Sequence, residues 1–111
     1  WHRDTGAAAI PYSAQAQGYF DKLVAGSVSG PAARNYDSET NRARGARLAA
    51  LAARHGVTPT QAMLALFAHA GFPVIPVVGC RNAAQIRASF RGANLVLSPD
   101  EARPFLPDLG L

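Results

Sequence analysis

The segment VIPVVGCRNAAQIRAS, residues 74–89, decides how this chain is expected to fold. It opens with an unbroken apolar run, 74–78, which predicts a strand covered on both faces. The run breaks at Gly79. Asn82 is a residue type that caps helices, and Gln85 follows at the capping-box position. The segment therefore predicts a buried strand, a tight turn and a helix.

The rest of the chain supplies a second strand and further helices. The short apolar run AAAIPY at 7–12 predicts a second buried strand. Glycine, proline and serine recur over 13–37, which predicts a loop with a helical turn at 19–23. Start and stop signals predict helices over 39–55, 60–70 and 83–90, and a short helix after Ser98. The expected fold class is therefore α/β, with two parallel strands and flanking helices.

The turn between the second strand and its helix has the chemistry of a phosphate site. A helix N-terminus presents unpaired N–H groups and a partial positive charge, and Gly79 allows a close approach to the backbone. Arg81 adds a guanidinium that matches phosphate geometry. A glycine and a capping asparagine also occur at such turns for structural reasons alone. The residues by themselves leave both interpretations open.

Composition narrows the class of protein. The chain has 111 residues, of which 49% are hydrophobic, enough for one small domain. Its single cysteine excludes an internal disulfide and favours a reducing, cytoplasmic setting. No apolar run approaches the roughly 20 residues of a membrane span. The net charge is +4, and no acidic residue lies between Glu39 and Asp100, so an anionic ligand would fit there. For single arginines outside 81–91, the general abundance of arginine in the sequence is the preferred explanation. Because the chain begins with Trp1, we expect a fragment.

Several motifs in order resemble the C-terminal portion of an aldo-keto reductase. They are YSAQAQGYF at 12–20, Asn35-Tyr36, HGVTPTQAMLALFAHAGFPVIPVVGCRNAAQIRAS at 55–89 and ANLVLSPDE at 93–101. The resemblance covers nearly all of residues 1–111. It implies the last part of a (β/α)₈ TIM barrel, whose full length is about 250 residues. The two predicted strands would be the seventh and eighth of that barrel, and the missing N-terminal part would be a partner.

The resemblance also implies a cofactor, NADP(H), and a small carbonyl substrate, an aldehyde or a ketone. Tyr12 matches the aromatic residue that stacks on the nicotinamide. The loop along the pyrophosphate would include Ser13, Gln15 and Gln17. The turn that holds the 2′-phosphate would be Gly79, Cys80 and Arg81, and the residues beside the adenine would be Gln85 and Ser89.

No residue of the chain matches the catalytic motifs of that family. The aspartate, tyrosine, lysine and histidine of the family come from earlier strands. Lys22, the single lysine, is expected to be a solvated charge in the loop. One cysteine without ligand spacing predicts no metal site. We therefore expect the chain to orient a cofactor and to be inactive alone, because a reductase also needs a proton donor.

A small nucleic-acid-binding or interaction module is the alternative. LAALAARHGVTPTQAMLAL, residues 48–66, has the helix, glycine turn, helix order of a helix-turn-helix. A recognition helix needs polar and basic side chains, and residues 58–72 contain no arginine or lysine. This absence favours the enzyme interpretation, with no nucleic acid and no membrane as partners. A fragment that pairs with another chain to complete a sheet is compatible with that interpretation.

Overall fold

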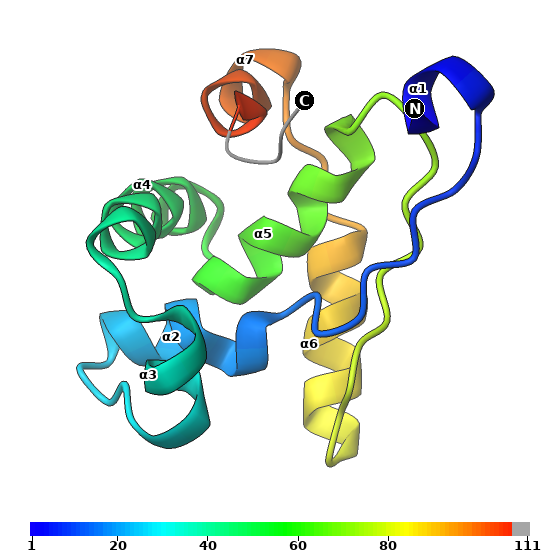
Figure 1. The fold of residues 1–111 in the computed structure, drawn as a ribbon. Helices are drawn as coiled ribbons and strands as arrows, with labels where there is room; N and C mark the ends of the chain where they lie inside the picture. The colour runs from blue at the N-terminus through cyan, green and yellow to red at the C-terminus, as the bar shows by residue number, and fades with distance from the viewer. Residues whose placement is uncertain (108–111) are drawn as a thin grey trace.

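The computed structural model describes residues 1–107, and this part of the chain folds into helices joined by loops and extended segments (Figure 1). In chain order the elements are α1 (His2–Thr5), the 3₁₀ helix η1 (Ala16–Gly18), α2 (Tyr19–Val24), α3 (Gly30–Tyr36), α4 (Glu39–His55), α5 (Pro59–Leu66), η2 (Phe67–His69), α6 (Ala83–Ala93), α7 (Pro99–Ala102) and η3 (Arg103–Phe105).

The prediction of two strands is wrong, because within residues 1–107 the backbone forms no strand and no sheet. Segments 7–12 and 73–78 are extended and run parallel, but they share a single isolated bridge between Ala9 and Val74. Three backbone hydrogen bonds of 2.9 Å join them, and in the last of these Val77 N donates to the carbonyl oxygen of Pro11. A further bond, from position 11 to the carbonyl oxygen of Ile75, would complete a second bridge, but Pro11 has no N–H group to donate. The ladder therefore stops after one bridge.

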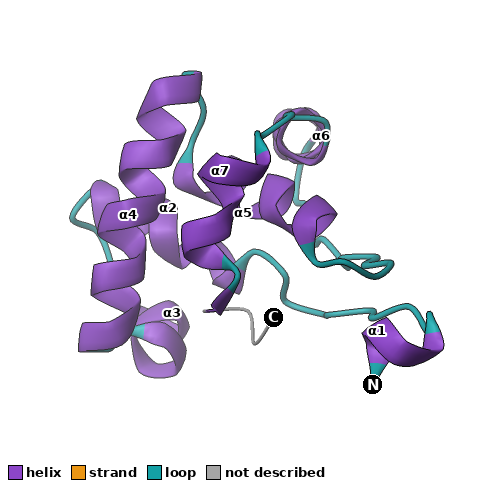
Figure 2. Cartoon of the chain, turned by 90° about the horizontal axis from the view of Figure 1, so that it is seen from above, coloured by secondary structure: helices purple, strands orange, loops and turns teal. Residues whose placement is uncertain are grey.

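The expectation that these segments are buried on both faces is also wrong. Ile10 is 64% exposed and Ile75 is 56% exposed. The register of the bridge places these two side chains beside each other on one uncovered face. Segment 7–12 joins α1 to η1, and segment 73–78 joins η2 to α6. Among the described residues the figures draw no strand on either side of them (Figures 1 and 2). The expectation of a TIM-barrel fragment with two parallel strands is therefore corrected to a helical fold.

Helix α4 forms where the sequence predicts it, at 39–55. Ser38 accepts a hydrogen bond from Asn41 N at 3.1 Å and caps the first turn. Gly56 ends the helix with φ 62°, a left-handed conformation that glycine adopts without a steric penalty. The helix buries one stripe, which includes Leu48 and Leu51. Residues capable of starting and stopping a helix thus determine both ends.

Helix α5 is the buried centre of the molecule. Thr58 and Gln61 form a complete capping box, with bonds of 2.9 and 3.3 Å. Seven of its eight residues are buried: Pro59, Thr60, Gln61, Ala62, Leu64, Ala65 and Leu66. The predicted helix over 60–70 is shorter than expected, since a 3₁₀ turn follows at Phe67–His69. A helix buried on nearly every side cannot enter a DNA groove, so the structure removes the feature that favoured the helix-turn-helix alternative.

Two close contacts hold α6 against α5. The Gln61 side chain donates from Nε2 to the carbonyl oxygen of Ala88 at 2.9 Å. A Cβ atom on Gly92 would lie 2.8 Å from Gln61 Cα, so glycine is required for the approach of the two helices. Because α6 follows the segment 73–78 directly, this packing fixes the position of the turn between them.

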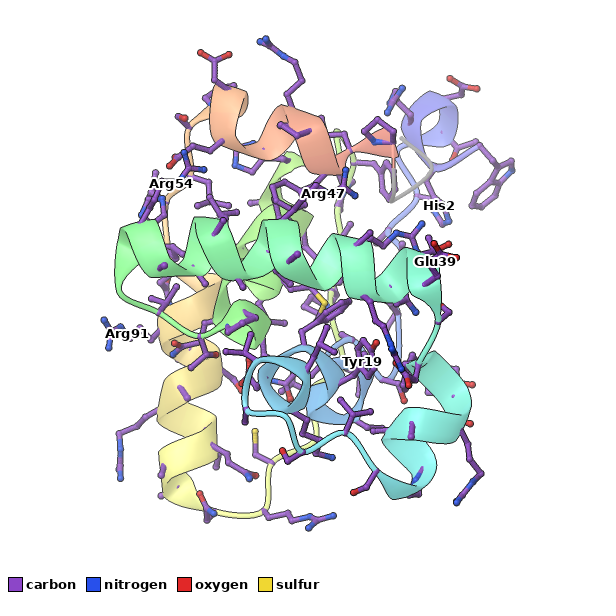
Figure 3. All side chains as sticks on the ribbon, turned by 90° about the vertical axis from the view of Figure 1, so that its left-hand side faces the viewer. His2, Tyr19, Glu39, Arg47, Arg54 and Arg91 are labelled. Carbon is purple, nitrogen blue, oxygen red and sulfur yellow. The ribbon has the colours of Figure 1, made fainter. Side chains whose placement is uncertain are left out.

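The hydrophobic core lies where α2, α4 and α5 meet the C-terminal helices. Its buried members are Tyr19, Phe20, Leu48, Leu51, Ala52, Ala62, Ala65, Leu66, Leu97, Ala102 and Phe105. Tyr19 is fully buried beneath α4 (Figure 3). Its hydroxyl donates to Asp37 at 3.0 Å, which satisfies the one polar atom of this side chain.

The loop predicted over 13–37 contains two α-helices and the 3₁₀ helix η1. The helical turn expected at 19–23 is α2, whereas α3 (Gly30–Tyr36) lies where the sequence predicts loop. Helix α3 begins with Pro31 near its first position, a start signal that the surrounding glycine and serine residues obscured. Lys22 accordingly lies on a helix rather than in a loop.

Candidate functional site

The two extended segments end at the same side of the molecule. Their parallel register, fixed by Ala9 and Val74, places Tyr12 beside Val77. The chain then enters the loop 13–18 after the first segment and the turn 79–82 after the second. The structure thus brings together the two parts of the chain that contain the predicted site residues.

A direct contact joins these two parts. Gln15 Nε2 donates to the hydroxyl oxygen of Ser89 at 2.9 Å, although the two residues are 74 positions apart. The sulfur of Cys80 lies 3.6 Å from the same hydroxyl oxygen. All three side chains are half-buried. Ser89 is therefore the point at which the loop and the turn meet on α6.

A shallow apolar groove lies beside this contact. Its volume is about 310 Å³, and its lining residues are Val78, Cys80, Ile86, Ser89 and Phe90. Small-molecule sites in proteins have volumes from about 300 Å³ upward and combine apolar walls with a few polar groups. The groove has this composition, with the Ser89 hydroxyl and the Cys80 thiol as its polar groups.

The turn at 79–82 presents hydrogen-bond donors to solvent. Asn82 accepts from Gln85 N at 2.9 Å and caps α6 as predicted. The Gln85 side chain accepts from Arg81 N at 2.7 Å, one position earlier than a standard capping box requires. The Arg81 side chain is exposed, and a Cβ on Gly79 would meet nothing within 4 Å. A cationic group and open space thus adjoin the positive end of an 11-residue helix.

The loop 13–18 has an unusual backbone. Three residues other than glycine adopt positive φ values: Ser13 at 54°, Ala16 at 47° and Gln17 at 56°. Such conformations cost free energy, and they concentrate at sites that bind ligands. Lys22 Nζ donates to the Gln17 carbonyl oxygen at 3.0 Å and supports the loop, a role that its expected position in solvent did not suggest.

The remaining predicted site residues make fewer contacts. Tyr12 is 84% exposed, and its ring is free to stack against a flat ligand. The Ser13 and Gln17 side chains are exposed. The structure thus links Gln15, Cys80 and Ser89 directly and Arg81 to Gln85. Within residues 1–107 the side chains of Tyr12, Ser13 and Gln17 make no hydrogen bond, and Gly79 has no side chain.

Sequence reasoning missed three residues of the groove, Val78, Ile86 and Phe90. Ile86 and Phe90 are exposed, at 47% and 66%, and they lie four positions apart on α6. This i, i+4 pair of large apolar side chains was the available signal, since such residues share one face of a helix.

The strongest shifts of pKa lie outside this region. Hydrogen bonds from the Arg42 guanidinium, supported by the Tyr19 hydroxyl, lower the pKa of Asp37 to about 2. Burial, followed by the bond to Asp37, raises the pKa of Tyr19. Because Asp37 accepts from both partners, this cluster stabilises the junction of α2, α3 and α4. Tyr19 is therefore a structural residue rather than a proton donor to a ligand.

Neither a metal cluster nor a membrane span is present in residues 1–107. This part of the chain holds no group of three His, Cys, Asp or Glu residues placed to bind a metal ion. Nor does it contain a helix with the length and hydrophobicity needed to span a membrane.

Comparison with known proteins identifies the family. The chain matches the model of the Aldo/keto reductase family over residues 2–104, and it belongs to this family. Norsolorinic acid reductase of Emericella nidulans is 29% identical over 96 residues, which are 86% of this chain and 25% of that protein. The chain thus spans about one quarter of the length of this curated relative. No solved structure matches the chain.

Proposed function

We propose that this chain is the cofactor-binding portion of an NADP(H)-dependent oxidoreductase that reduces aldehydes or ketones to alcohols. Membership of the Aldo/keto reductase family supports the reaction class. The observation that carries the assignment is the contact of Gln15 and Cys80 with Ser89, which gathers the loop 13–18 and the turn 79–82 at one groove.

The turn at 79–82 suits the 2′-phosphate of NADP(H). The amides of Ala83 and Ala84 have no hydrogen-bond partner within residues 1–107, as is usual in the first turn of a helix. Together with the Arg81 guanidinium they can donate to phosphate oxygens. Gly79 and Cys80 leave room for the phosphate, and we assign Gln85 to the adenine edge.

The loop 13–18 suits the other half of the cofactor. Its exposed polar residues, Ser13 and Gln17, would lie along the pyrophosphate, and the exposed ring of Tyr12 would stack on the nicotinamide. The bound cofactor supplies the hydride of the reaction. The residues of this chain bind and orient the cofactor, which is the contribution that the protein makes to hydride chemistry.

The proton donor and the carbonyl-binding pocket are not assigned to residues of this chain. The Tyr19 hydroxyl, whose pKa is raised by burial, donates to Asp37. We therefore assign acid catalysis and contact with the carbonyl substrate to the parts of an aldo-keto reductase that this chain does not cover. We propose that these parts are the partner of the chain. A cytoplasmic location is proposed from the reducing setting that the single cysteine favours.

A binding measurement tests this proposal. The purified chain is titrated with NADPH by isothermal titration calorimetry, with NADH and adenosine 2′,5′-bisphosphate as comparison ligands. Saturable binding of NADPH and of adenosine 2′,5′-bisphosphate, with weaker binding of NADH, is expected. Absence of binding by all three ligands would contradict the proposed function.

A further inference from the structure

We propose that Gln15 and Ser89 are positioning residues, whose mutual hydrogen bond holds the loop 13–18 against α6 and so fixes the two halves of the cofactor surface relative to each other. This inference rests on the proposed function for its meaning. The contact itself is a property of the structure, at 2.9 Å between Gln15 Nε2 and Ser89 Oγ.

Direct contact of either side chain with the cofactor explains the observations less well. The Ser89 hydroxyl already accepts from Gln15 and faces the sulfur of Cys80. Both Gln15 and Ser89 are half-buried, whereas Tyr12, Arg81 and Gln85 are exposed to an approaching ligand. Exposed residues can bind the cofactor, while these two bind each other.

The backbone of the loop shows why it needs such an attachment. Gln15 lies between Ser13 and Ala16, which both have positive φ values, and Gln17 follows with a third. Conformations of this kind persist where surrounding contacts determine them. The turns within the loop, from Ala16 N to Ser13 O and from Gly18 N to Gln15 O at 2.8 Å each, fix its shape. The Gln15 side chain fixes its position relative to α6.

The length of the ligand determines which binding reactions depend on this attachment. NADPH reaches from the turn 79–82 to the loop 13–18, so its affinity depends on their relative position. Adenosine 2′,5′-bisphosphate carries the 2′-phosphate and the adenine but no nicotinamide, and it reaches the turn alone. A surface held in its bound arrangement before binding loses less conformational entropy when the ligand binds.

Four variants test the role in binding. Ser89→Ala and Gln15→Ala are each expected to weaken NADPH binding about tenfold, the size of one lost hydrogen bond of roughly 1.4 kcal/mol. The affinity for adenosine 2′,5′-bisphosphate should change less than about twofold, because this ligand does not span both halves of the cofactor surface. The double variant should lose no more NADPH affinity than either single variant, since each substitution removes the same hydrogen bond. Ser89→Thr keeps the hydroxyl and should restore NADPH affinity.

Arg87→Ala is the matched control, because Arg87 is exposed on α6 and has no assigned role. Additive losses in the double variant, or equal losses for NADPH and adenosine 2′,5′-bisphosphate, would overturn the positioning role. Equal losses of affinity for the two ligands would mean that Gln15 and Ser89 support the turn 79–82 or contact the adenosine half of the cofactor.

Hydrogen exchange tests the attachment without any cofactor. The amides of Ala16 and Gly18, which donate within the loop, should exchange faster in Ser89→Ala than in wild type, while amides of the α5 core remain unchanged. Unchanged exchange in the loop would overturn the attachment. Failure of wild type to bind NADPH, together with faster exchange in the variant, would overturn the proposed function and the positioning role but leave the attachment established.

Discussion

His55 and Glu101 join the end of α4 to the start of α7 through a contact of 2.7 Å between Nε2 and Oε1. The other carboxylate oxygen of Glu101 accepts from Ser98 N at 2.9 Å and completes the capping box of α7. The Ser98 amide, and after it the His55 ring, lower the pKa of Glu101 to about 2. One carboxylate therefore stabilises two helix ends, and its charge contributes to the docking of the C-terminal segment.

Replacement of Glu101 by glutamine should destabilise the chain in a pH-dependent manner. The folded-state pKa of about 2 lies below the ordinary value of 4.5. The charge therefore stabilises the fold fully above pH 4.5, and this contribution is lost as the pH falls toward 2. Thermal unfolding followed by circular dichroism should show a lower Tm for Glu101→Gln at about pH 7 and a difference that closes in acid.

Asp100→Asn is the control for this experiment. Asp100 pairs with Arg103 at 2.9 Å on the surface, and both side chains are largely exposed. Exposed pairs of this kind contribute little to stability. A difference between Glu101→Gln and wild type that persists unchanged from neutral pH to about pH 2 would show that the charge of Glu101 is not the stabilising feature.

Gly92→Ala should destabilise the contact between α5 and α6. The added Cβ would lie 2.8 Å from Gln61 Cα and 2.9 Å from its carbonyl oxygen, and both are backbone atoms that cannot turn aside. Overpacking of this kind costs roughly 1–3 kcal/mol. This loss should exceed the gain of about 1 kcal/mol in helix propensity that alanine brings.

Urea unfolding of Gly92→Ala and of Gly79→Ala provides the comparison. A Cβ atom added to Gly79 would enter open space, and the φ value of this residue lies outside the left-handed region. Its replacement should therefore change stability by no more than about 0.5 kcal/mol. A Gly92→Ala variant as stable as wild type would mean that α6 shifts without cost.

The chain alone should not oxidise NADPH in the presence of aldehydes or ketones. Binding and orientation of a cofactor do not suffice, because carbonyl reduction also needs a positioned proton donor. The buried hydroxyl of Tyr19 donates to Asp37, and within residues 1–107 Tyr19 is not among the residues that line the groove. The oxidation of NADPH, followed by its absorbance with a panel of carbonyl compounds, should equal the buffer blank. Turnover above the blank would place the catalytic groups within this chain.

The sequence predicted helix ends better than strands. The helices predicted over 60–70 and after Ser98 both form, and capping boxes of Thr58 with Gln61 and of Ser98 with Glu101 start them. Asn82 caps α6 as expected. These contacts lie within a few residues of each other, so the local sequence contains all that they need.

A strand needs partners elsewhere in the chain, and the apolar pattern does not supply them. The prolines at positions 11, 73 and 76 lack the N–H groups that a ladder uses, and within residues 1–107 no third segment pairs with 7–12 or 73–78. Proline in both apolar runs was the signal against strands. The contact between Gln15 and Ser89 also could not be predicted from the local sequence, because it depends on how α6 packs against α5.

The most direct test of the cofactor assignment is the ratio of NADPH to NADH affinity in wild type and in Arg81→Ala, measured by titration of the purified chain. Arg81 is exposed beside the start of α6, where its guanidinium can pair with a 2′-phosphate that NADH lacks. Loss of this charge-assisted bond, worth roughly 1.5–3 kcal/mol, should weaken NADPH binding about tenfold to a hundredfold. NADH affinity should change little, so that the preference for NADPH disappears. An unchanged NADPH affinity, or equal losses for both cofactors, would contradict the account.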